Sequence, residues 1–427
     1  MNQWIRSGLW IRVGVGLVAL ASLLAVASAG DYEVAESAVE RNLSPEVSEG
    51  ALAALVAGNT GFAFDLYQAL RRAEGNLFFS PYSISSALSM TYAGARGTTE
   101  AQMAAVLRSL PQAEQHPAMN ALDLSLLPDE PGDGVEAFEL RIANALWGQR
   151  GYGFLQGFLD VLAANYGAGL HLLDFATAPE PSRLTINDWV AEQTRDKILN
   201  LLAPGTITTD TVLVLTNAIY FLGKWAVPFR AESTSPGPFY LLDCTEVTVP
   251  RMRQRSHHSY GRGEGYQAIE LPYRGGDMSM VLLLPDPGWF EAFEASLTGE
   301  RFAEIVSELA HEDVQLTLPK FTFEDEFRLG ETLREMGMTD AFSAPLADFS
   351  GMNGRRDIAI GEVVHKAFVA VDEEGTEAAA ATAVIMVGTG IAPAEPIRLV
   401  FDRPFLFAIR DRATGTVLFL GRVLDPS

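Results

Sequence analysis

Residues 211–221, TVLVLTNAIYF, constrain the fold of this chain more than any other stretch of its sequence. The run is rich in β-branched and aromatic residues, and apolar side chains occupy both odd and even positions. Because successive side chains of a strand point to opposite faces, such a strand needs a covering layer on each side. The run therefore predicts a strand at the centre of a sheet that is buried on both faces.

Helical patterns dominate the first half of the chain and strand patterns dominate the second half. Helices are predicted at residues 51–72, 83–93, 98–110, 154–166, 182–202 and 327–336. Strands are predicted at residues 211–221, 267–271, 278–284, 314–323, 358–371, 399–400, 405–410 and 417–423. This order predicts an α+β fold with helices packed on large sheets. Since no repeat and no clear boundary follows residue 51, we expect one domain over residues 51–427.

The N-terminus is typical of a secretory signal. Arg6 and Arg12 precede an apolar run at residues 13–26, and an A-x-A cleavage site ends at Ala29. We therefore predict a signal peptide at residues 1–29, cleaved near Ala29, and a protein secreted to the periplasm or the extracellular space. An uncleaved membrane anchor is the alternative, although the run is short for one. Residues 30–50 are acidic and poor in aromatic residues, which predicts a linker.

The net charge limits the possible partners, and the cysteine content limits how the fold can be stabilised. The formal net charge is −23, which disfavours nucleic acid and anionic membrane surfaces. Cys244 is the single cysteine, so no internal disulfide can form. With 48% hydrophobic residues the chain can instead depend on a large core.

Motifs of known catalytic chemistry are absent from the sequence. There is no G-x-S-x-G elbow, no Walker A motif, no H-E-x-x-H and no S-x-x-K. The glycine-rich residues 261–265 lack the strand and helix of a phosphate site and predict a turn. The adjacent His257 and His258 point opposite ways on an extended chain, which favours a surface pair over a metal site. We therefore expect no catalytic residues, no cofactor and no metal, and a hydrolase has no motif to support it.

Short stretches along nearly the whole chain resemble, in order, the serpin family. They are NLFFSPYS (76–83), TNAIYFLGKW (216–225), LPY (271–273), LLLP (282–285), LPKF (318–321), ADFSG (347–351), VHKA (364–367), FDRPFLF (401–407) and GRV (421–423). Single pieces would be weak, but their shared order over residues 51–426 is specific. The chain thus resembles a secreted, prokaryotic-type serpin.

The resemblance implies a fold with three β-sheets, about eight or nine helices and an exposed reactive-centre loop. It also implies a suicide inhibitor of serine proteases rather than an enzyme. The protease would cleave the loop and form an acyl-enzyme, after which the loop inserts as a new strand of the main sheet and the protease stays covalently trapped. The expected partner is a serine protease, and the inhibitor is expected to be monomeric.

The segment EEGTEAAAATAVIM, residues 373–386, falls where serpins carry the hinge of this loop. Its alanine run favours a helix and the following β-branched run favours a strand, so it has no settled structure of its own. If Thr376 faces the core on insertion, the alternate positions do so too, and all are small. The predicted hinge residues are Glu373, Gly375, Thr376, Ala378, Ala380 and Thr382. A non-inhibitory serpin with a binding or carrier function is the alternative, but such members often carry charged or bulky hinge residues.

The resemblance also implies a cluster that controls opening of the sheet. Ser80, Ser83, Asn217 and His365 match positions that are hydrogen bonded beneath the sheet in the family. Trp225 matches the aromatic residue where the loop first enters. Apart from the family, a histidine in the apolar stretch around His365 would more often be a satisfied core residue than a catalytic base.

The scissile bond is predicted by counting along the loop. The seventeenth residue from Glu373 is Thr389, which gives the bond Thr389–Gly390, whereas counting back from residues 401–405 points near Pro393. The loop is therefore about four residues longer than the common pattern, and we follow the hinge-side count because the inserted length governs the trap. No lysine or arginine lies in residues 373–397, which favours elastase-like or subtilisin-like targets over trypsin-like ones.

Heparin is not an expected partner. Some serpins bind heparin through the region that corresponds roughly to residues 98–117. Arg108 is the single cation of that stretch in this chain, so a glycosaminoglycan site is not expected there.

Overall fold

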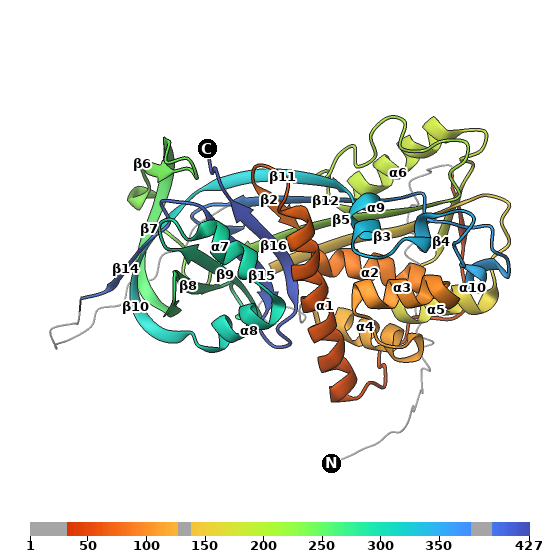
Figure 1. The fold of residues 1–427 in the computed structure, drawn as a ribbon, viewed down its shortest axis with the longest axis horizontal. Coiled ribbons are helices and arrows are strands. Elements are labelled where there is room, and N and C mark those ends of the chain that lie inside the picture. Colours follow the sequence, from red (N-terminus) through yellow and green to blue (C-terminus); the bar gives the residue numbers. More distant parts are fainter. Residues whose placement is uncertain (1–31, 127–137, 377–394) are drawn as a thin grey trace, which may run out of the picture. The chain divides into compact units, whose positions relative to one another are not determined.

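Two sheets and a set of helices make up the part of the chain that the structure describes. The structure is a computed structural model and describes residues 32–126, 138–376 and 395–427. Ten α-helices lie in these residues, as shown in Figure 1: α1 (Glu49–Leu70), α2 (Pro81–Tyr92), α3 (Gly97–Leu107), α4 (Gln112–Leu126), α5 (Gln156–Tyr166), α6 (Pro179–Gln193), α7 (Phe290–Ser296), α8 (Gly299–Ser307), α9 (Gly330–Glu335) and α10 (Ser350–Asn353). The predicted α+β class is confirmed, and the ten helices, of which α10 has only four residues, are close to the eight or nine that the resemblance implied.

The larger helices cover a seven-stranded sheet. Its strands, in spatial order, are β1 (Glu33–Ala35), β4 (Leu170–Leu173), β3 (Phe138–Gln149), β5 (Leu213–Lys224), β13 (Gly375–Thr376), β12 (Glu362–Val371) and β11 (Phe321–Arg328). Helix α2 packs against β3 and β5, and side chains of α6 form a separate core with the other face of these strands. Strand β5 is buried along nearly its whole length, as the apolar run at 211–221 predicted.

A nine-stranded sheet contains the remaining strands. In spatial order these are β14 (Ile397–Val400), β10 (Ala310–Pro319), β7 (Glu246–Gly263), β8 (Tyr266–Pro272), β9 (Met278–Pro285), β15 (Phe405–Asp411), β16 (Val417–Val423) and β2 (Leu77–Phe79), with β6 (Ser235–Tyr240) paired to β7. Strand β7 pairs with β6 and β10 along most of its length and with β8 at its end. Strand β7 therefore connects two smaller sheets into one nine-stranded sheet. Together with the seven-stranded sheet, these two account for the expected three.

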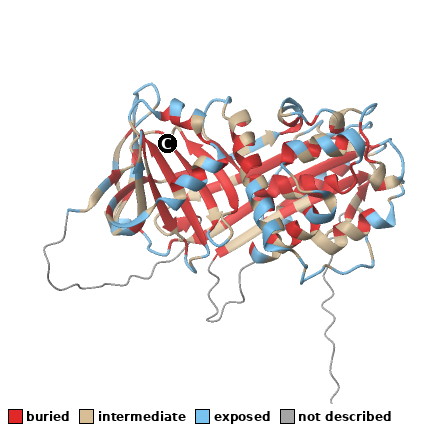
Figure 2. Ribbon diagram, turned by 60° about the horizontal axis from the view of Figure 1, so that its bottom comes forward, coloured by how far each residue is buried: buried red, intermediate tan, exposed pale blue. Residues whose placement is uncertain are grey.

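Burial follows this arrangement. Figure 2 shows that buried residues concentrate in the strands, while the outer faces of the helices are exposed. No helix in residues 32–126, 138–376 and 395–427 is both long and apolar enough to span a membrane.

Two predicted elements end earlier than the sequence pattern suggested. The helix expected at 182–202 stops at Gln193, because Arg195 and Asp196 adopt positive φ angles of 50° and 59° that a right-handed helix cannot contain. The strand expected at 314–323 is two strands: β10 ends at Pro319, and β11 begins at Phe321 in the other sheet. Proline has no N–H to continue a ladder, which accounts for the break.

The described part of the acidic segment 30–50 is packed against the domain rather than extended as a linker. Strand β1 adds to the edge of the sheet by pairing with β4. Further along, the Arg41 guanidinium donates to Asn120 Oδ1 at 2.9 Å and forms an ion pair with Asp123 on α4. Composition alone predicted the linker, but it carries no information on such tertiary partners.

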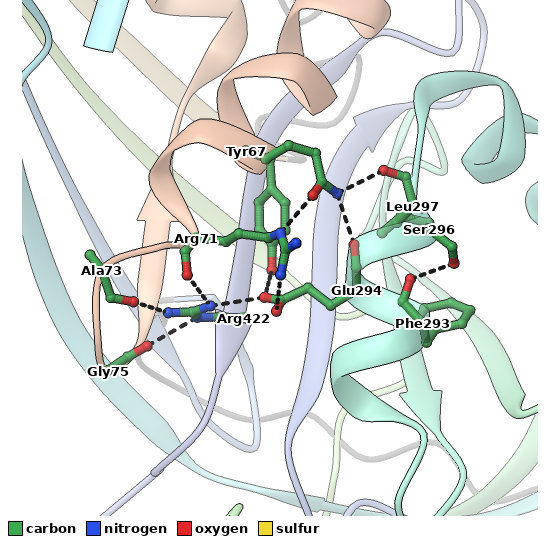
Figure 3. A network of polar contacts seen from close by, with 10 residues as sticks. Tyr67, Arg71, Ala73, Gly75, Phe293, Glu294, Ser296, Leu297 and Arg422 are labelled. Carbon is green, nitrogen blue, oxygen red and sulfur yellow. Dashed lines mark hydrogen bonds and ion pairs between the residues drawn. The ribbon is translucent and has the colours of Figure 1, made fainter. Parts of the chain in front are cut away.

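A buried ionic network fastens the C-terminal strand β16 to α1 and α7 (Figure 3). Arg422 Nη1 lies 2.9 Å from Glu294 Oε1, and only 5% and 4% of the two side chains are exposed. Tyr67 Oη donates to the same carboxylate oxygen at 2.6 Å. The Arg422 guanidinium also donates to the carbonyl oxygens of Arg71, Ala73 and Gly75. Each nitrogen of this buried guanidinium group therefore donates to at least one oxygen.

Candidate functional site

The centre of the seven-stranded sheet is occupied by two residues of the predicted hinge. Gly375 and Thr376 form β13, which is antiparallel to both of its neighbours, β5 and β12. Beyond β13 these neighbours pair directly with each other in parallel, from Glu362 opposite Val214 to Ala367 opposite Ile219. The hinge thus enters one end of a seam between two long strands, and direct pairing closes the seam from Ile219 and Ala367 onward.

A turn held by several hydrogen bonds leads into β13. The carboxylate of Asp372 accepts from the backbone N–H groups of Glu374 and Gly375. Glu373 is fixed by Lys320 Nζ and by the Thr234 hydroxyl, each 2.7 Å from one of its carboxylate oxygens. Burial would raise the pKa of Glu373, but these hydrogen bonds hold it below its usual value. The first predicted hinge residue is therefore a charged anchor outside the seam.

Gly375 is placed where no other residue could lie without a shift of the backbone. A Cβ atom at this position would lie 2.0 Å from the carbonyl oxygen of Gly223 on β5. Because the obstacle is backbone rather than a flexible side chain, the glycine is required by close approach of two strands. This explains in structural terms why the hinge has glycine at this point.

Thr376 faces the core. The residue is only 2% exposed, and its hydroxyl lies 2.7 Å from Tyr273 Oη. Trp225 stacks on the Tyr273 ring, with centroids 4.7 Å apart, and its backbone N–H donates to Glu374 O. The indole Nε1 donates to Asp372 O at 3.0 Å. Trp225 therefore lies at the entrance of the hinge, where the resemblance placed it.

Asn217 and His365 close the seam farther along. They are direct register partners on β5 and β12, and their side chains are hydrogen bonded through Asn217 Oδ1 and His365 Nδ1. Asn217 Nδ2 also donates to Ser83 Oγ at 2.6 Å and to Asn144 Oδ1 on β3. These side chains link three strands of the sheet to α2 beneath it.

Ser80 ties the same cluster to the C-terminal strand. As the N-cap of α2 it accepts from the Ser83 N–H at 3.1 Å, and its hydroxyl donates to Leu418 O at 2.6 Å. Its backbone N–H donates to His365 Nε2 at 3.0 Å. Because the Ser80 hydroxyl points to a carbonyl and not to the imidazole, the two residues are not a nucleophile and its base.

The protonation state of His365 follows from its partners. Since Nε2 accepts from Ser80 N–H, the proton of the neutral ring is on Nδ1, where it is donated to Asn217. The residue is fully buried, and burial lowers its pKa to about 3. Protonation would remove the acceptor that Ser80 uses, so the cluster depends on a neutral imidazole.

We expect the native protein to lose stability on acidification in a way that depends on His365. An unfolded chain binds the proton near pH 6.5, but the folded chain does so only near its pKa of about 3. The contribution of His365 to the free energy of unfolding is therefore fully present above pH 6.5. Below that pH it falls by up to about 1.4 kcal/mol per pH unit. Urea unfolding between pH 7.5 and 5.0 should show a smaller loss for His365→Gln than for the unaltered protein.

Other ionisable side chains also change the stability of the protein over this pH range. Burial lowers the pKa of His116, His171 and His258 to about 4, so these histidines act in the same direction. Burial raises the pKa of Asp325 to about 6, so its protonation in the folded state opposes the loss between pH 6 and 3.8. The comparison with His365→Gln isolates one group from this sum, and equal pH slopes in both proteins would contradict the prediction.

The structure brings together four of the predicted cluster residues and places the fifth elsewhere. Ser80, Ser83, Asn217 and His365 are in contact, whereas Trp225 belongs to the hinge. Two further residues of the site were not predicted: Asn144, which has no motif around it, and Tyr273, which lies in one of the matching stretches. The predicted residues outside the described part of the chain are Ala378, Ala380, Thr382, Thr389 and Gly390. In the described part no group of three or more metal-binding side chains is present.

Comparisons with known proteins match this chain to one family along most of its length. Residues 57–426 match the family described as "Serpin (serine protease inhibitor)". Human leukocyte elastase inhibitor is 42% identical over 383 residues, which cover 87% of this chain and 99% of the relative. The native structure of the thermophilic serpin tengpin superposes with a TM-score of 0.80 at 28% identity, covering 92% of this chain and 97% of tengpin. Human thyroxine-binding globulin has a TM-score of 0.78 at 30% identity, with coverages of 88% and 100%.

Proposed function

The chain belongs to the serpin family of serine protease inhibitors, and we propose that it is a monomeric suicide inhibitor that traps its target as a covalent acyl-enzyme. The observation that carries this proposal is the two-residue strand β13. It already pairs with both β5 and β12 at one end of their seam, and the hinge continues from it. A cleaved loop could therefore lengthen an existing strand instead of starting a new one.

The register of β13 indicates where an inserting loop would go. Thr376 lies opposite Gly223 and Val371, whereas Asn217 and His365 lie six positions farther along their strands (223 − 217 = 6; 371 − 365 = 6). In an antiparallel continuation position 382 (376 + 6) would meet that pair. Thr382 would have the same orientation as Thr376, so a hydroxyl would enter where the Asn217–His365 bond now closes the seam.

The proposed chemistry takes place at the predicted bond Thr389–Gly390. The protease serine oxygen attacks the Thr389 carbonyl carbon, the C–N bond to Gly390 breaks, and the amine leaves with the proton that the protease's base took from the serine. The ester then joins protease and inhibitor. Insertion would add on the order of ten backbone hydrogen bonds at about 1 kcal/mol each, and it would carry the ester away before water can hydrolyse it.

We expect elastase-like and subtilisin-like proteases to be trapped. The absence of lysine and arginine from residues 373–397 supports this preference, as does the printed name of the human relative, leukocyte elastase inhibitor. Incubation with elastase or subtilisin should give a complex that survives SDS, whereas trypsin should give none. Mass spectrometry of the released C-terminal fragment should find Gly390 at its N-terminus. A complex with trypsin alone would contradict the proposed specificity.

The proposed site of action is outside the cytoplasm, in the periplasm or the extracellular space. Only the sequence pattern of residues 1–29 supports this part of the proposal: a basic start, an apolar run and a cleavage site near Ala29.

A second candidate function is that of a non-inhibitory carrier of a small ligand. It is favoured by an apolar cavity of about 600 Å³ between α1 and α8, lined by residues that include Val56, Phe302 and Val306. Thyroxine-binding globulin, a relative by structure, binds thyroxine, as its name says. The two candidates differ in what they require of the hinge, and Thr376→Arg separates them.

A further inference from the structure

A positively charged face lies on the nine-stranded sheet beside the end of the loop. Strand β7 carries Arg253, Arg255 and His257 at alternate positions, so the three side chains share one face. The residues between and beside them on the other face include Met252 and His258, which are buried. The arginine-bearing face is therefore the outward one.

Neighbouring strands extend this face. Gln315 on β10 pairs with Arg255 on one side and with Arg398 of β14 on the other, which places the two arginines in one row. His311 of β10 stacks on His257 with ring centroids 5.5 Å apart. Of these residues Arg255, His257, His311 and Arg398 are exposed and Arg253 is half-buried. We call Arg253, Arg255, His257, His311 and Arg398 the basic face.

Its arginines are only partly neutralised. Arg255 forms an ion pair with Asp313 at 2.6 Å, the one acidic residue that shares this side of β7, β10 and β14. Arg253 donates to the neutral Ser235 Oγ and Ser233 O. The Arg398 side chain has no ion pair or hydrogen bond with the described residues. Among the residues that the structure describes, two of the three guanidinium groups thus have no acidic partner, in a chain whose formal net charge is −23.

The position of Arg398 relates this face to the proposed target. It lies nine positions after Thr389 in the sequence, and an extended chain of that length spans at most about 30 Å. A protease bound at the scissile bond is therefore held within this distance of β14, and β10 and β7 are the next strands of the same sheet.

We propose that the basic face is a docking surface for an acidic surface segment of the target protease, an inference that rests on the proposed inhibitory function. At physiological salt, exposed charges interact over about 8 Å. Because of this short range, the basic face acts on charged protease groups close to the loop, although the chain as a whole is acidic. Complementary charge at an interface mainly raises the association rate and excludes wrong partners. The face would select, among proteases that accept Thr389, those with acidic residues near the cleft.

The test compares two triple variants with the same change of charge. Arg253→Glu/Arg255→Glu/Arg398→Glu reverses the basic face, and Arg72→Glu/Arg195→Glu/Arg355→Glu is the control. The control side chains are 78%, 59% and 60% exposed and belong to other elements. Each variant changes the formal charge from −23 to −29, because each of three substitutions removes one positive charge and adds one negative charge. Any difference between them reports on location and not on total charge.

The first readout is association with subtilisin and with subtilisin whose lysines have been succinylated, which makes an acidic protease with the same catalytic residues. For the succinylated enzyme we expect reversal of the basic face to lower the association rate constant at least tenfold more than the control does at 50 mM NaCl. The difference should shrink at 500 mM NaCl. Equal effects of the two variants would overturn the proposal.

The second readout does not depend on inhibition. A fluorescent deca-glutamate peptide should bind the unaltered protein and the control at low salt, and bind the reversed face at least tenfold more weakly. If no protease forms a complex but the peptide result holds, the inhibitory function fails while the acidic-ligand surface stands. If heparin binds this face and succinylation changes nothing, the surface is a polyanion site and the docking proposal is overturned.

Discussion

Replacing Thr376 with arginine is expected to convert the inhibitor into a substrate. The position is 2% exposed between β5 and β12, and the native hydroxyl is satisfied by Tyr273. An arginine there would place an unpaired charge within the sheet, which costs several kcal/mol. Since about 1.4 kcal/mol is a factor of ten, we expect at least about 100-fold fewer trapped complexes per loop cleaved. The ratio of SDS-resistant complex to cleaved inhibitor measures this directly.

Thr376→Ser is the matched control, because it keeps the hydroxyl and the small size. It should inhibit nearly as well as the unaltered protein. A carrier would keep its ligand affinity in Thr376→Arg, since its cavity lies between α1 and α8 and not at the hinge. Undiminished trapping by Thr376→Arg would refute insertion as the inhibitory step, and an unaltered protein that never traps a protease would favour the carrier.

Replacing Arg422 with methionine is expected to lower the free energy of unfolding by about 3 kcal/mol, because it leaves a buried carboxylate without its main partner. Glu294 is 4% exposed on its side chain. Arg71 remains 3.4 Å from the other carboxylate oxygen, which is why we expect the lower end of the usual range. The loss would also leave three backbone carbonyl groups without their donor. Urea denaturation followed by tryptophan fluorescence measures the change.

The double variant Arg422→Met/Glu294→Gln distinguishes the charge from the packing. A neutral amide can still accept from Tyr67, so the double variant should recover part of the lost stability. If the double variant is as unstable as the sum of the two single variants, the uncompensated charge is not the cause of the loss.

Local patterns predicted those parts of the fold and site that are set by neighbours in the sequence. The apolar run at 211–221 predicted the buried strand β5. The helix predicted at 83–93 begins two residues earlier, at Pro81, because Ser80 caps it and proline is favourable in the first turn. The small residues of the hinge indicated that this segment can enter a sheet. The structure places Gly375 and Thr376 in that sheet.

Other parts depend on contacts that no local pattern contains. Asn144 joins the cluster only because β3 lies beside β5 in the sheet, and these strands are far apart in the sequence. The anchoring of Glu373 requires Lys320 and Thr234 from two other segments. The acidic composition of residues 30–50 gave no indication that β1 would pair with β4. In each case the missing information is the order of strands in space.

The bond from the Ser80 hydroxyl to Leu418 joins residues 338 positions apart. During synthesis β16 follows α2 and every strand of the seven-stranded sheet, so α2 and the sheet that it supports must wait for β16 before this contact can form. Contacts between such distant residues make folding slow, and partly folded chains expose strands that can pair with other chains. A chain truncated before β16 would therefore leave the ribosome without the contact between α2 and Leu418 and would be prone to aggregate.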